Sequence, residues 1–545
     1  FALGSPGSAL VPGLRSQARE LFLDSGADVA KGAADKALEL ANETDDIVYF
    51  FDEIMIKNYL KEQILLNFGF EPTLGQSEAL DSLCDFILSG SNDALFVLRG
   101  FAGTGKTLLI AALVKTLGQI ERQCVLMAPT GRAAKVFSLY SEHPAFTIHK
   151  RIYRQKSIDN DSIFSLNYNM LANVLFIVDE ASMIANDGLS GSVYGTGRLL
   201  DDLVQFVYGG HGCKLILMGD TAQLPPVGEG ESPALQDDVM AGYGLDVVSH
   251  TLRHVVRQQE ESGILWNATR LRQLVEDEEF FCLPKIRFSG FADVKNVPGN
   301  ELIETISDCY SHCGTDETMV VCRSNKRAHV YNNGIRNQIL GREEELSSGD
   351  LLLIAKNNYF WMRPDESDDK DDSEDASTVK NMVPTDFIAN GDVAVVERVR
   401  NVRELYGFRF ADCWLRLPDY DDYELEATVL LDTLHSESPA LSREDNERLF
   451  NNIMEDYMDI PNKRERMKKM KEDPYFNALQ IKYAYAVTCH KAQGGQWQRV
   501  FVDQGYMTED MLGPDYFRWL YTALTRATET VYFVNWREEQ TLECE

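Results

Sequence analysis

Short apolar runs alternate with segments of helical period in the first half of the chain. Each run is five residues long, and helical stretches separate it from the next; the runs occupy 94–98, 123–127, 174–178 and 214–218. Strands separated by helices indicate a parallel sheet with helices packed on it. The pattern therefore predicts an α/β core over residues 71–260.

A second set of apolar runs predicts another α/β core over residues 261–545. These runs are found at 318–322, 499–503 and 530–534. The long interval between the first two contains strand-like pieces and then an acidic helical stretch. We expect this interval, about 345–480, to be an inserted β-rich subdomain, because one continuous sheet does not accommodate it.

Two smaller segments stand apart from these cores. Residues 1–70 have helical, amphipathic periodicity, and we expect a helical N-terminal segment of unknown role. Residues 150–172 alternate polar and aromatic positions around 163–168, which suits a small hairpin projecting from the first core.

Charge and targeting signals narrow the classes of protein. The 545 residues have a formal charge of −32, which taken alone argues against a nucleic-acid partner. Much of the acid lies in discrete runs such as 365–375, however, so a local basic groove remains compatible with the composition. No run of eighteen apolar residues predicts a membrane span, and the first residues lack the features of a signal peptide. We therefore expect an intracellular, cytoplasmic protein.

The segment from Gly100 to Thr107, Gly-Phe-Ala-Gly-Thr-Gly-Lys-Thr, carries the strongest chemical signal. It follows an apolar strand and precedes an apolar helix, the setting that a phosphate-binding loop requires. Its backbone N–H groups and the helix N-terminus favour phosphate. The residues predicted to bind a nucleoside triphosphate are Gly103, Thr104, Gly105, Lys106 and Thr107, with Lys106 reaching the outer phosphates.

Carboxylates and an amide follow later strands of the same predicted sheet. Asp179 and Glu180 end the third strand, and Gln223 lies beyond the fourth. We expect Thr107 and Asp179 to hold Mg²⁺, and Glu180 to activate the attacking water. Gln223 is placed to sense the γ-phosphate.

Two arginines from elsewhere could complete this site. Arg257 lies where the first core gives way to the second, and Arg526 follows a late segment of the second core. A second core that brings arginines to the nucleotide of the first would complete the site only when the cores close together.

The order of these motifs resembles that of superfamily 1 helicases of the RecD-like and Dda-like branch, over about residues 73–536. The resemblance rests on the phosphate loop and on a series of further segments: 72–76, 128–134, 147–149, 179–182, 219–226, 256–258, 487–494 and 521–527. It implies two RecA-like cores with parallel sheets, a hairpin subdomain in the first core and an SH3-like β-rich subdomain in the second. Gly495 and Gln496 depart from the family pattern, which has a single glycine followed by an acidic residue.

The resemblance also assigns roles to residues. It implies that Gln76 reads adenine, that Gly494 belongs to the nucleotide site, and that a single DNA strand crosses both cores on Thr130, His149, Asn325, Thr488, His490 and Lys491. Such backbone contacts carry no base identity. Phe164 and Tyr168 are candidates for base stacking or strand separation, as is Phe137, for which a place in the helix core is the alternative.

The expected function is an ATP- and Mg²⁺-dependent helicase that moves 5′ to 3′ on single-stranded DNA and unwinds ss/dsDNA junctions. The alternatives are a RecD-type motor subunit of a larger nuclease or repair complex, an RNA-directed superfamily 1 relative, and a nucleotide-switched interaction protein. We expect a monomer from a bacterial or phage-like source. The acidic insertions or the N-terminal segment could dock a protein partner.

Overall fold

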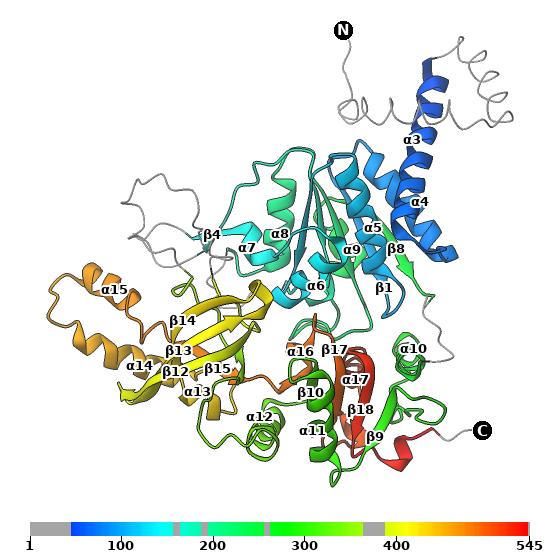
Figure 1. The fold of residues 1–545 in the computed structure, drawn as a ribbon. Helices are drawn as coiled ribbons and strands as arrows, with labels where there is room; N and C mark the ends of the chain where they lie inside the picture. The colour runs from blue at the N-terminus through cyan, green and yellow to red at the C-terminus, as the bar shows by residue number, and fades with distance from the viewer. Residues whose placement is uncertain (1–44, 156–163, 187–194, 255–261, 363–386, 543–545) are drawn as a thin grey trace, which may run out of the picture.

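The computed structural model describes residues 45–155, 164–186, 195–254, 262–362 and 387–542, with side chains of the first helix described from residue 54. Its strands form two open parallel sheets, a closed barrel and a two-stranded antiparallel pair. Figure 1 shows the first sheet and its helices above the second, with the barrel at one side of both. Among the described residues, no helix is both long and apolar enough to cross a membrane.

The first core is a six-stranded sheet in which every pair is parallel. Its strand order is β3-β2-β6-β7-β1-β8. The strands are β1 (Ala94–Gly100), β2 (Cys124–Ala128), β3 (Ala145–Thr147), β6 (Leu175–Val178), β7 (Lys214–Gly219) and β8 (Asp246–Leu252). β1 lies between β7 and the edge strand β8, and the loop that follows it opens at the carboxyl edge of the sheet, where ligands of such sheets bind.

Helices cover both faces of this sheet, as alternation along β1 requires. Phe96 and Leu98 face one helical layer, whereas Leu95 and Val97 face the other. The first layer contains α3 (Asp45–Phe68), α4 (Leu74–Leu88) and α5 (Lys106–Gln119), and the second contains α7 (Ile148–Ile152), α8 (Leu199–Tyr208) and α9 (Asp237–Ala241). Helix α3 thus belongs to the packing of the first core, because its buried Leu60, Ile64 and Phe68 join the same apolar cluster as α4 and α5. Residues 1–44 of the predicted N-terminal segment lie outside the described residues.

The second core is a five-stranded parallel sheet of order β16-β10-β17-β18-β9. Its strands are β9 (Val294–Val297), β10 (Thr318–Cys322), β16 (Ala486–Thr488), β17 (Trp497–Asp503) and β18 (Ala527–Val534). Its helices are α10 (Gly263–Glu276), α11 (Leu302–Cys313), α12 (Asn325–Gly334), α16 (Cys489–Ala492) and α17 (Pro514–Leu524). With the first sheet, this establishes the predicted α/β class with two parallel-sheet cores.

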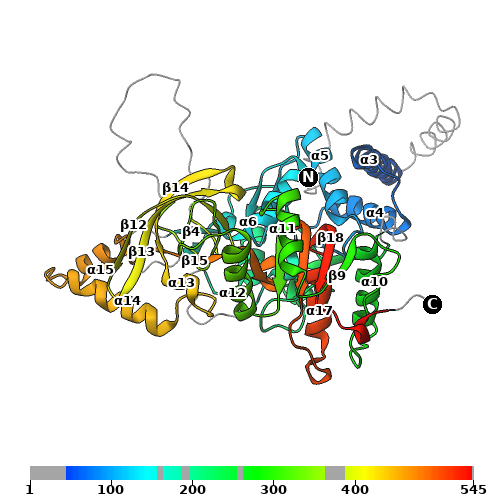
Figure 2. The ribbon, with the colours of Figure 1, turned by 60° about the horizontal axis from the view of Figure 1, so that its bottom comes forward.

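Two insertions accompany the cores. The barrel comprises β11 (Leu351–Ile354), β12 (Val393–Leu405), β13 (Phe408–Leu417), β14 (Tyr423–Leu430) and β15 (Leu479–Tyr483), and Figure 2 shows its strands curling round a common axis. Helices α13 (Asp432–His435), α14 (Arg443–Asp456) and α15 (Lys463–Lys471) lie between its last two strands. The antiparallel pair of β4 (Tyr153–Gln155) and β5 (Phe164–Leu166) extends from the first core, and Phe164 packs on Tyr359 near the barrel, with ring centroids 4.3 Å apart.

The region between β2 and β3 holds α6 (Gly131–Ser141), whose first turn faces the barrel. A Cβ placed on Gly131 would lie 2.9 Å from an Asp392 carboxylate oxygen and 3.2 Å from the Tyr420 hydroxyl. Lys135, one turn further along, donates to the carbonyl of Pro418. The barrel is therefore inserted in the second core by sequence but rests on the first.

Candidate functional site

The loop between β1 and α5 curls tightly around its own backbone. Gly103 and Gly105 have φ of 78° and 80°, in the left-handed region that favours glycine. A Cβ on Gly100 would lie 2.8 Å from Thr104 Oγ1 and 2.9 Å from Lys106 Cγ. The glycines at these positions therefore allow the compact loop that a phosphate group requires.

Lys106 lies on the first turn of α5 and turns its ammonium group back over the loop. Its Nζ donates to the carbonyl oxygens of Gly100 and, at 3.1 Å, Phe101. Thr104 is fully buried, and its hydroxyl donates to the Phe101 carbonyl at 2.8 Å. The cation is thus held beside the helix N-terminus, where two sources of positive potential overlap.

Gln76 lies against this loop, but both ends of its amide have partners in the protein. Its Oε1 accepts from the Thr73 backbone N–H at 2.9 Å as part of a capping box that begins α4. Its Nε2 donates to the Thr104 carbonyl at 2.9 Å, and the side chain is 1% exposed. In this arrangement Gln76 anchors the phosphate loop to α4, a role different from the expected contact with adenine.

Asp179 and Glu180 directly follow β6, beside the phosphate loop. The Thr107 hydroxyl lies 3.3 Å from Asp179 Oδ2, and the Glu180 backbone N–H donates to Asp179 Oδ1 at 2.7 Å. Burial, together with the Glu180 carboxylate, raises the pKa of Asp179 to about 7. Glu180 has a φ of 52°, a strained conformation for a residue with a side chain. A pair of crowded carboxylates of this kind is suited to a divalent cation.

Gln223 follows β7 at the same edge of the sheet. It is 6% exposed, and its Oε1 has no hydrogen-bond partner. A buried amide oxygen without a partner favours an additional ligand or water at this point. Together with the carboxylates and the glycine cradle, it shows that the residues present fit a nucleotide with Mg²⁺. No cluster of three His, Cys, Asp or Glu side chains occurs in the described part of the chain, so phosphate oxygens would have to complete the ligand set.

The second core reaches this edge through α17. The Ala102 backbone N–H donates to the Tyr521 hydroxyl at 2.9 Å, and that hydroxyl donates to Asp220 Oδ2 at 2.6 Å. Arg526, at the end of the same helix, is 3% exposed and donates to the carbonyls of Thr522 and Gly495. Its guanidinium is therefore bonded within its own core. Arg257 lies outside the described residues.

The two residues of the first core that are expected to contact a DNA strand lie at the start of α6 and on α7. The Thr130 hydroxyl accepts from the Ala133 backbone N–H and caps α6. His149 is half-buried near Tyr153, and burial lowers its pKa to about 4, so it is neutral at pH 7. A Cβ on Gly494 would lie 3.0 Å from Thr130 Oγ1 and from Ala133 Cβ, so Gly494 packs against the start of α6.

The aromatic candidates of the first core also differ in exposure. Phe137 is fully buried, which selects its helix-core alternative, and Phe164 is buried against Tyr359. Tyr168 is 77% exposed, with the Arg154 guanidinium 5.2 Å from its ring centroid. Tyr168 therefore remains a candidate for stacking on a base.

Three residues of the second core that are expected to contact a DNA strand line one pocket, together with residues of the barrel. Asn325, Thr488 and Lys491 line it, together with residues that the sequence did not single out, among them His329, Ser436, Ser438 and Lys482. Burial lowers the pKa of both lysines, that of Lys482 to about 8, partly through the charge of Lys491. Crowded cations are suited to a phosphate group. His490 is exposed and does not line this pocket.

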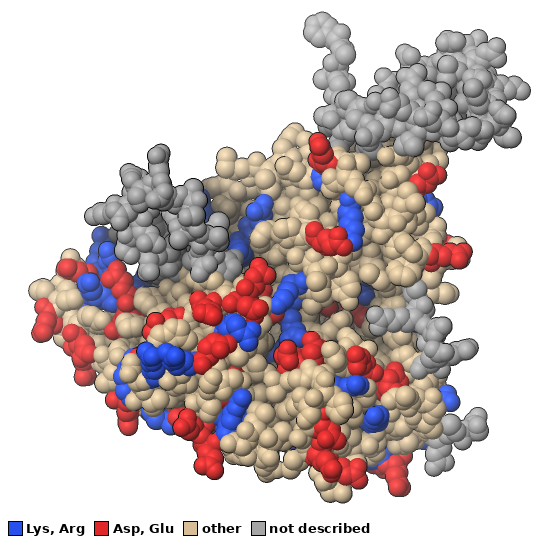
Figure 3. Space-filling view, viewed as in Figure 1, with Lys and Arg blue, Asp and Glu red and all other residues tan. Residues whose placement is uncertain are grey.

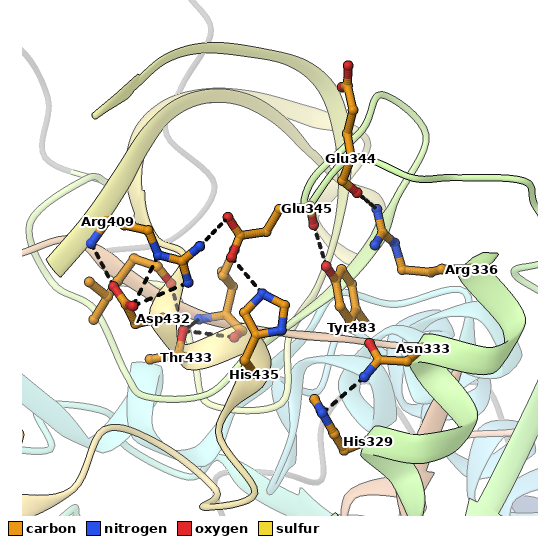
Figure 4. A network of polar contacts seen from close by, with 12 residues as sticks. His329, Asn333, Arg336, Glu344, Glu345, Arg409, Asp432, Thr433, His435 and Tyr483 are labelled. Atoms are coloured by element: carbon orange, nitrogen blue, oxygen red, sulfur yellow. Dashed lines mark hydrogen bonds and ion pairs between the residues drawn. The ribbon is translucent and has the colours of Figure 1, made fainter. Parts of the chain in front are cut away.

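A network of acidic and basic side chains lies beside this pocket and is joined to it by Tyr483. Figure 4 shows Arg409 and His435 both directed at Glu345, at 2.8 Å and 2.6 Å, while Tyr483 donates to the Glu345 carbonyl. On the face drawn in Figure 3, Lys and Arg side chains gather in a short column between the regions of α6 and α16, flanked by acidic side chains. The strongly negative chain therefore gathers cationic side chains on this face, between the regions of α6 and α16.

The two parallel-sheet cores, with a phosphate loop at their shared seam, define a P-loop NTPase built from two cores. The AAA domain family model matches residues 73–279, and the UvrD-like helicase C-terminal domain model matches residues 483–534. Through these two models and the relatives named below, the chain is similar to superfamily 1 helicases of the RecD-like and Pif1-like kinds.

Individual relatives resemble different shares of the chain. Uncharacterized protein R530 of Acanthamoeba polyphaga mimivirus is 22% identical over 529 residues, 84% of this chain and 99% of that protein. The ATP-dependent RecD2 DNA helicase of Deinococcus radiodurans is 30% identical over 157 residues, 29% of this chain and 19% of that protein. The ATP-dependent DNA helicase PIF1 of Emericella nidulans is 29% identical over 192 residues, 32% of this chain and 24% of that protein.

A solved structure of Pif1 helicase from Bacteroides in complex with ADP-AlF3 and ssDNA also matches. The match covers 87% of this chain and 95% of that one, at 14% identity. The TM-score is 0.39, so the two chains superimpose only loosely as wholes.

Proposed function

We propose that this chain is an ATP-dependent DNA helicase that moves 5′ to 3′ on single-stranded DNA and unwinds duplex at ss/dsDNA junctions. The observation that carries the proposal is the direct contact of the second core's α17 with Ala102 of the phosphate loop and with Asp220. A motor of this kind requires a nucleotide site whose parts come from two bodies that also hold the strand. The direction follows from the resemblance to RecD-like and Dda-like helicases.

In this proposal the residues of the nucleotide site divide the work. Lys106 and the loop N–H groups bind phosphate, and Glu180 orients or deprotonates the attacking water, with Gln223 sensing the γ-phosphate. Thr107 and Asp179 would hold Mg²⁺, which neutralises phosphate charge when bound. Arg526 would stabilise the transition state together with Arg257, which lies outside the described residues. Release of the guanidinium from the Thr522 and Gly495 carbonyls would be required first.

The strand would cross both cores on backbone contacts. Thr130 and His149 belong to the first core, while Asn325, Thr488 and Lys491 line the pocket of the second. We assign the β4–β5 pair as the hairpin subdomain of the first core, within the predicted limits of 150–172. We assign the barrel as the SH3-like subdomain of the second core; its last strand, β15, runs to Tyr483, just past the predicted limit of about 480. The contact of Phe164 with Tyr359 supports a joint action of these insertions on the junction.

The proposal is tested by unwinding of 5′-tailed and 3′-tailed DNA and RNA duplexes. Wild type is expected to open only the 5′-tailed DNA. Lys106→Ala and Glu180→Gln are expected to lose roughly 100-fold or more of the ATPase rate, the usual effect of removing a phosphate-binding or acid–base group. Lys115→Ala is the matched control, because Lys115 lies on the same helix but pairs with Glu142 at the surface. Preference for 3′ tails or for RNA would contradict the direction or the substrate.

A further inference from the structure

Helix α17 joins the two cores through hydrogen bonds to two of the first core's nucleotide-site loops, the phosphate loop and the loop that follows β7. Besides the bonds from Tyr521 to Ala102 and Asp220, the Leu224 backbone N–H donates to Thr522 Oγ1 at 2.9 Å. Gln493, which follows α16, donates to the Leu224 carbonyl at 2.7 Å. One short stretch of the second core therefore contacts the phosphate loop and the loop that carries Gln223.

Tyr521 is the central member of this set. It is 1% exposed, and its single hydroxyl accepts from a phosphate-loop N–H while donating to a carboxylate. The other carboxylate oxygen of Asp220 accepts from the Ala222 backbone N–H at 2.9 Å, next to Gln223. Burial and the Asp220 charge raise the pKa of Tyr521 well above its usual value, so the hydroxyl stays protonated and able to donate. Hydrogen bonds to a charged partner are the strong ones.

A contiguous set of contacts connects Tyr521 to the pocket of the second core. Thr488 is the N-cap residue of α16 and Lys491 lies within it, and both line this pocket. Cys489, between them in sequence, directs its thiol to the Trp519 carbonyl of α17 at 3.5 Å. Trp519 lies two residues before Tyr521. A shift of α16 caused by binding of a DNA strand is therefore passed to α17, the helix that carries the Tyr521 hydroxyl.

We propose that Tyr521 is a positioning residue that couples strand binding in the second core to ATP hydrolysis in the first, by setting the places of the Ala102 N–H and of the loop that begins with Asp220. This inference rests on the proposed function. It differs from the roles of Arg526 and Gln223, because Tyr521 acts through groups of the first core and has no charge to offer the phosphates.

The test compares the ATPase of wild type, Tyr521→Phe and Tyr516→Phe with and without single-stranded DNA. Tyr516 is the matched control: it lies on the same helix, is 2% exposed, and its hydroxyl bonds to Gln504 within the second core. Tyr521→Phe is expected to lower the DNA-stimulated kcat roughly 10-fold or more, as for a lost hydrogen bond to a charged group, with KM for ATP changed less than about threefold. Tyr516→Phe is expected to keep the stimulation within about twofold.

Equal stimulation in Tyr521→Phe and wild type would overturn the inference, and so would an equal loss in both variants, which would mark a general weakening of α17. A wild-type ATPase indifferent to DNA would instead overturn the proposed function. If Tyr521→Phe folds poorly, Asp220→Asn provides the second measurement. The double variant is expected to be no more impaired than Asp220→Asn alone, whereas independent losses that multiply would contradict coupling through this pair.

Discussion

The hydroxyl oxygen of Thr107 lies 3.3 Å from a carboxylate oxygen of Asp179, although the two residues are 72 positions apart. Thr107 is on the first turn of α5, and Asp179 directly follows β6. The carboxyl ends of the parallel strands bring them to the same edge of the sheet. A hydroxyl beside a carboxylate is a ligand pair that Mg²⁺ accepts.

Removing either oxygen is expected to raise the Mg²⁺ concentration at half-maximal ATPase rate. For Thr107→Ala and Asp179→Asn we expect a change of roughly 10-fold or more. Thr116→Ala is the control, since Thr116 is a buried residue of the same helix whose hydroxyl donates to the Ala112 carbonyl. A magnesium titration that is the same for Thr107→Ala and the control would contradict the assignment.

Substitution of Gln76 distinguishes a role in anchoring the phosphate loop from recognition of adenine. Because both ends of the amide bond to Thr73 and Thr104, Gln76→Ala is expected to loosen the phosphate loop and to raise KM for ATP and GTP by the same factor, roughly 2–10-fold. Ser82→Ala on the same helix is the control. A selective loss of ATP over GTP would instead support adenine reading by Gln76.

Much of the architecture follows from apolar runs that are long enough to recognise. The run at 94–98 predicts β1, and those at 174–178 and 214–218 predict β6 and β7 to within one residue at each end. β8 was not predicted, because this edge strand is only partly buried and its sequence, Asp-Val-Val-Ser-His-Thr-Leu, is mixed. Edge strands of this kind pack on one side only, and they lack the continuous apolar run of central strands.

The local chemistry of the site was predictable for a similar reason. The phosphate loop and the pair Asp179-Glu180 are contiguous in sequence, so residue spacing alone indicates them. Tyr521 and Lys482 depend on contacts across domains: Tyr521 meets Ala102 across 419 positions, and Lys482 enters its pocket from the end of a barrel strand. No local periodicity encodes such pairings.

Lys491 is expected to contribute one ionic contact to a strand. Lys491→Ala should weaken binding of single-stranded DNA and reduce the slope of log affinity against log salt by roughly 0.7. Lys469→Ala, on exposed α15, is the control. An unchanged salt slope in fluorescence-anisotropy titrations would remove Lys491 from the path of the strand.

The same pocket predicts a pH dependence. The pKa of Lys482 is lowered to about 8, so this lysine is charged below that pH and loses its charge above it. Affinity for single-stranded DNA is therefore expected to fall as the pH rises through about 8, and Lys482→Arg, which stays charged, is expected to flatten that fall. Identical pH profiles for both proteins would show that another group titrates.

Asp392 connects the barrel to the first core, and it should make the stability of the protein depend on pH. Its carboxylate accepts from the Tyr420 hydroxyl and the Ala389 N–H, both at 2.7 Å, and faces Gly131 at the start of α6. Burial raises its pKa from 3.8 to about 7, and the nearby Asp419 adds to that rise. An acid with a raised folded-state pKa favours unfolding once it is ionised, so its unfavourable effect is complete above about pH 7 and absent below about pH 4.

Asp392→Asn removes this ionisation and keeps an oxygen that can accept from Tyr420 or from the Ala389 N–H. The variant is therefore expected to unfold at a higher temperature than wild type at pH 8.5, by roughly 2–4 °C for each kcal/mol, and the difference should shrink as the pH is lowered towards 5. Asp308→Asn, an exposed substitution on α11, is the control and should show no such trend. A difference between Asp392→Asn and wild type that stays constant from pH 5 to 8.5 would show that Asp392 keeps its ordinary pKa, and that the barrel is held on α6 by packing and by the bond from Lys135 to Pro418.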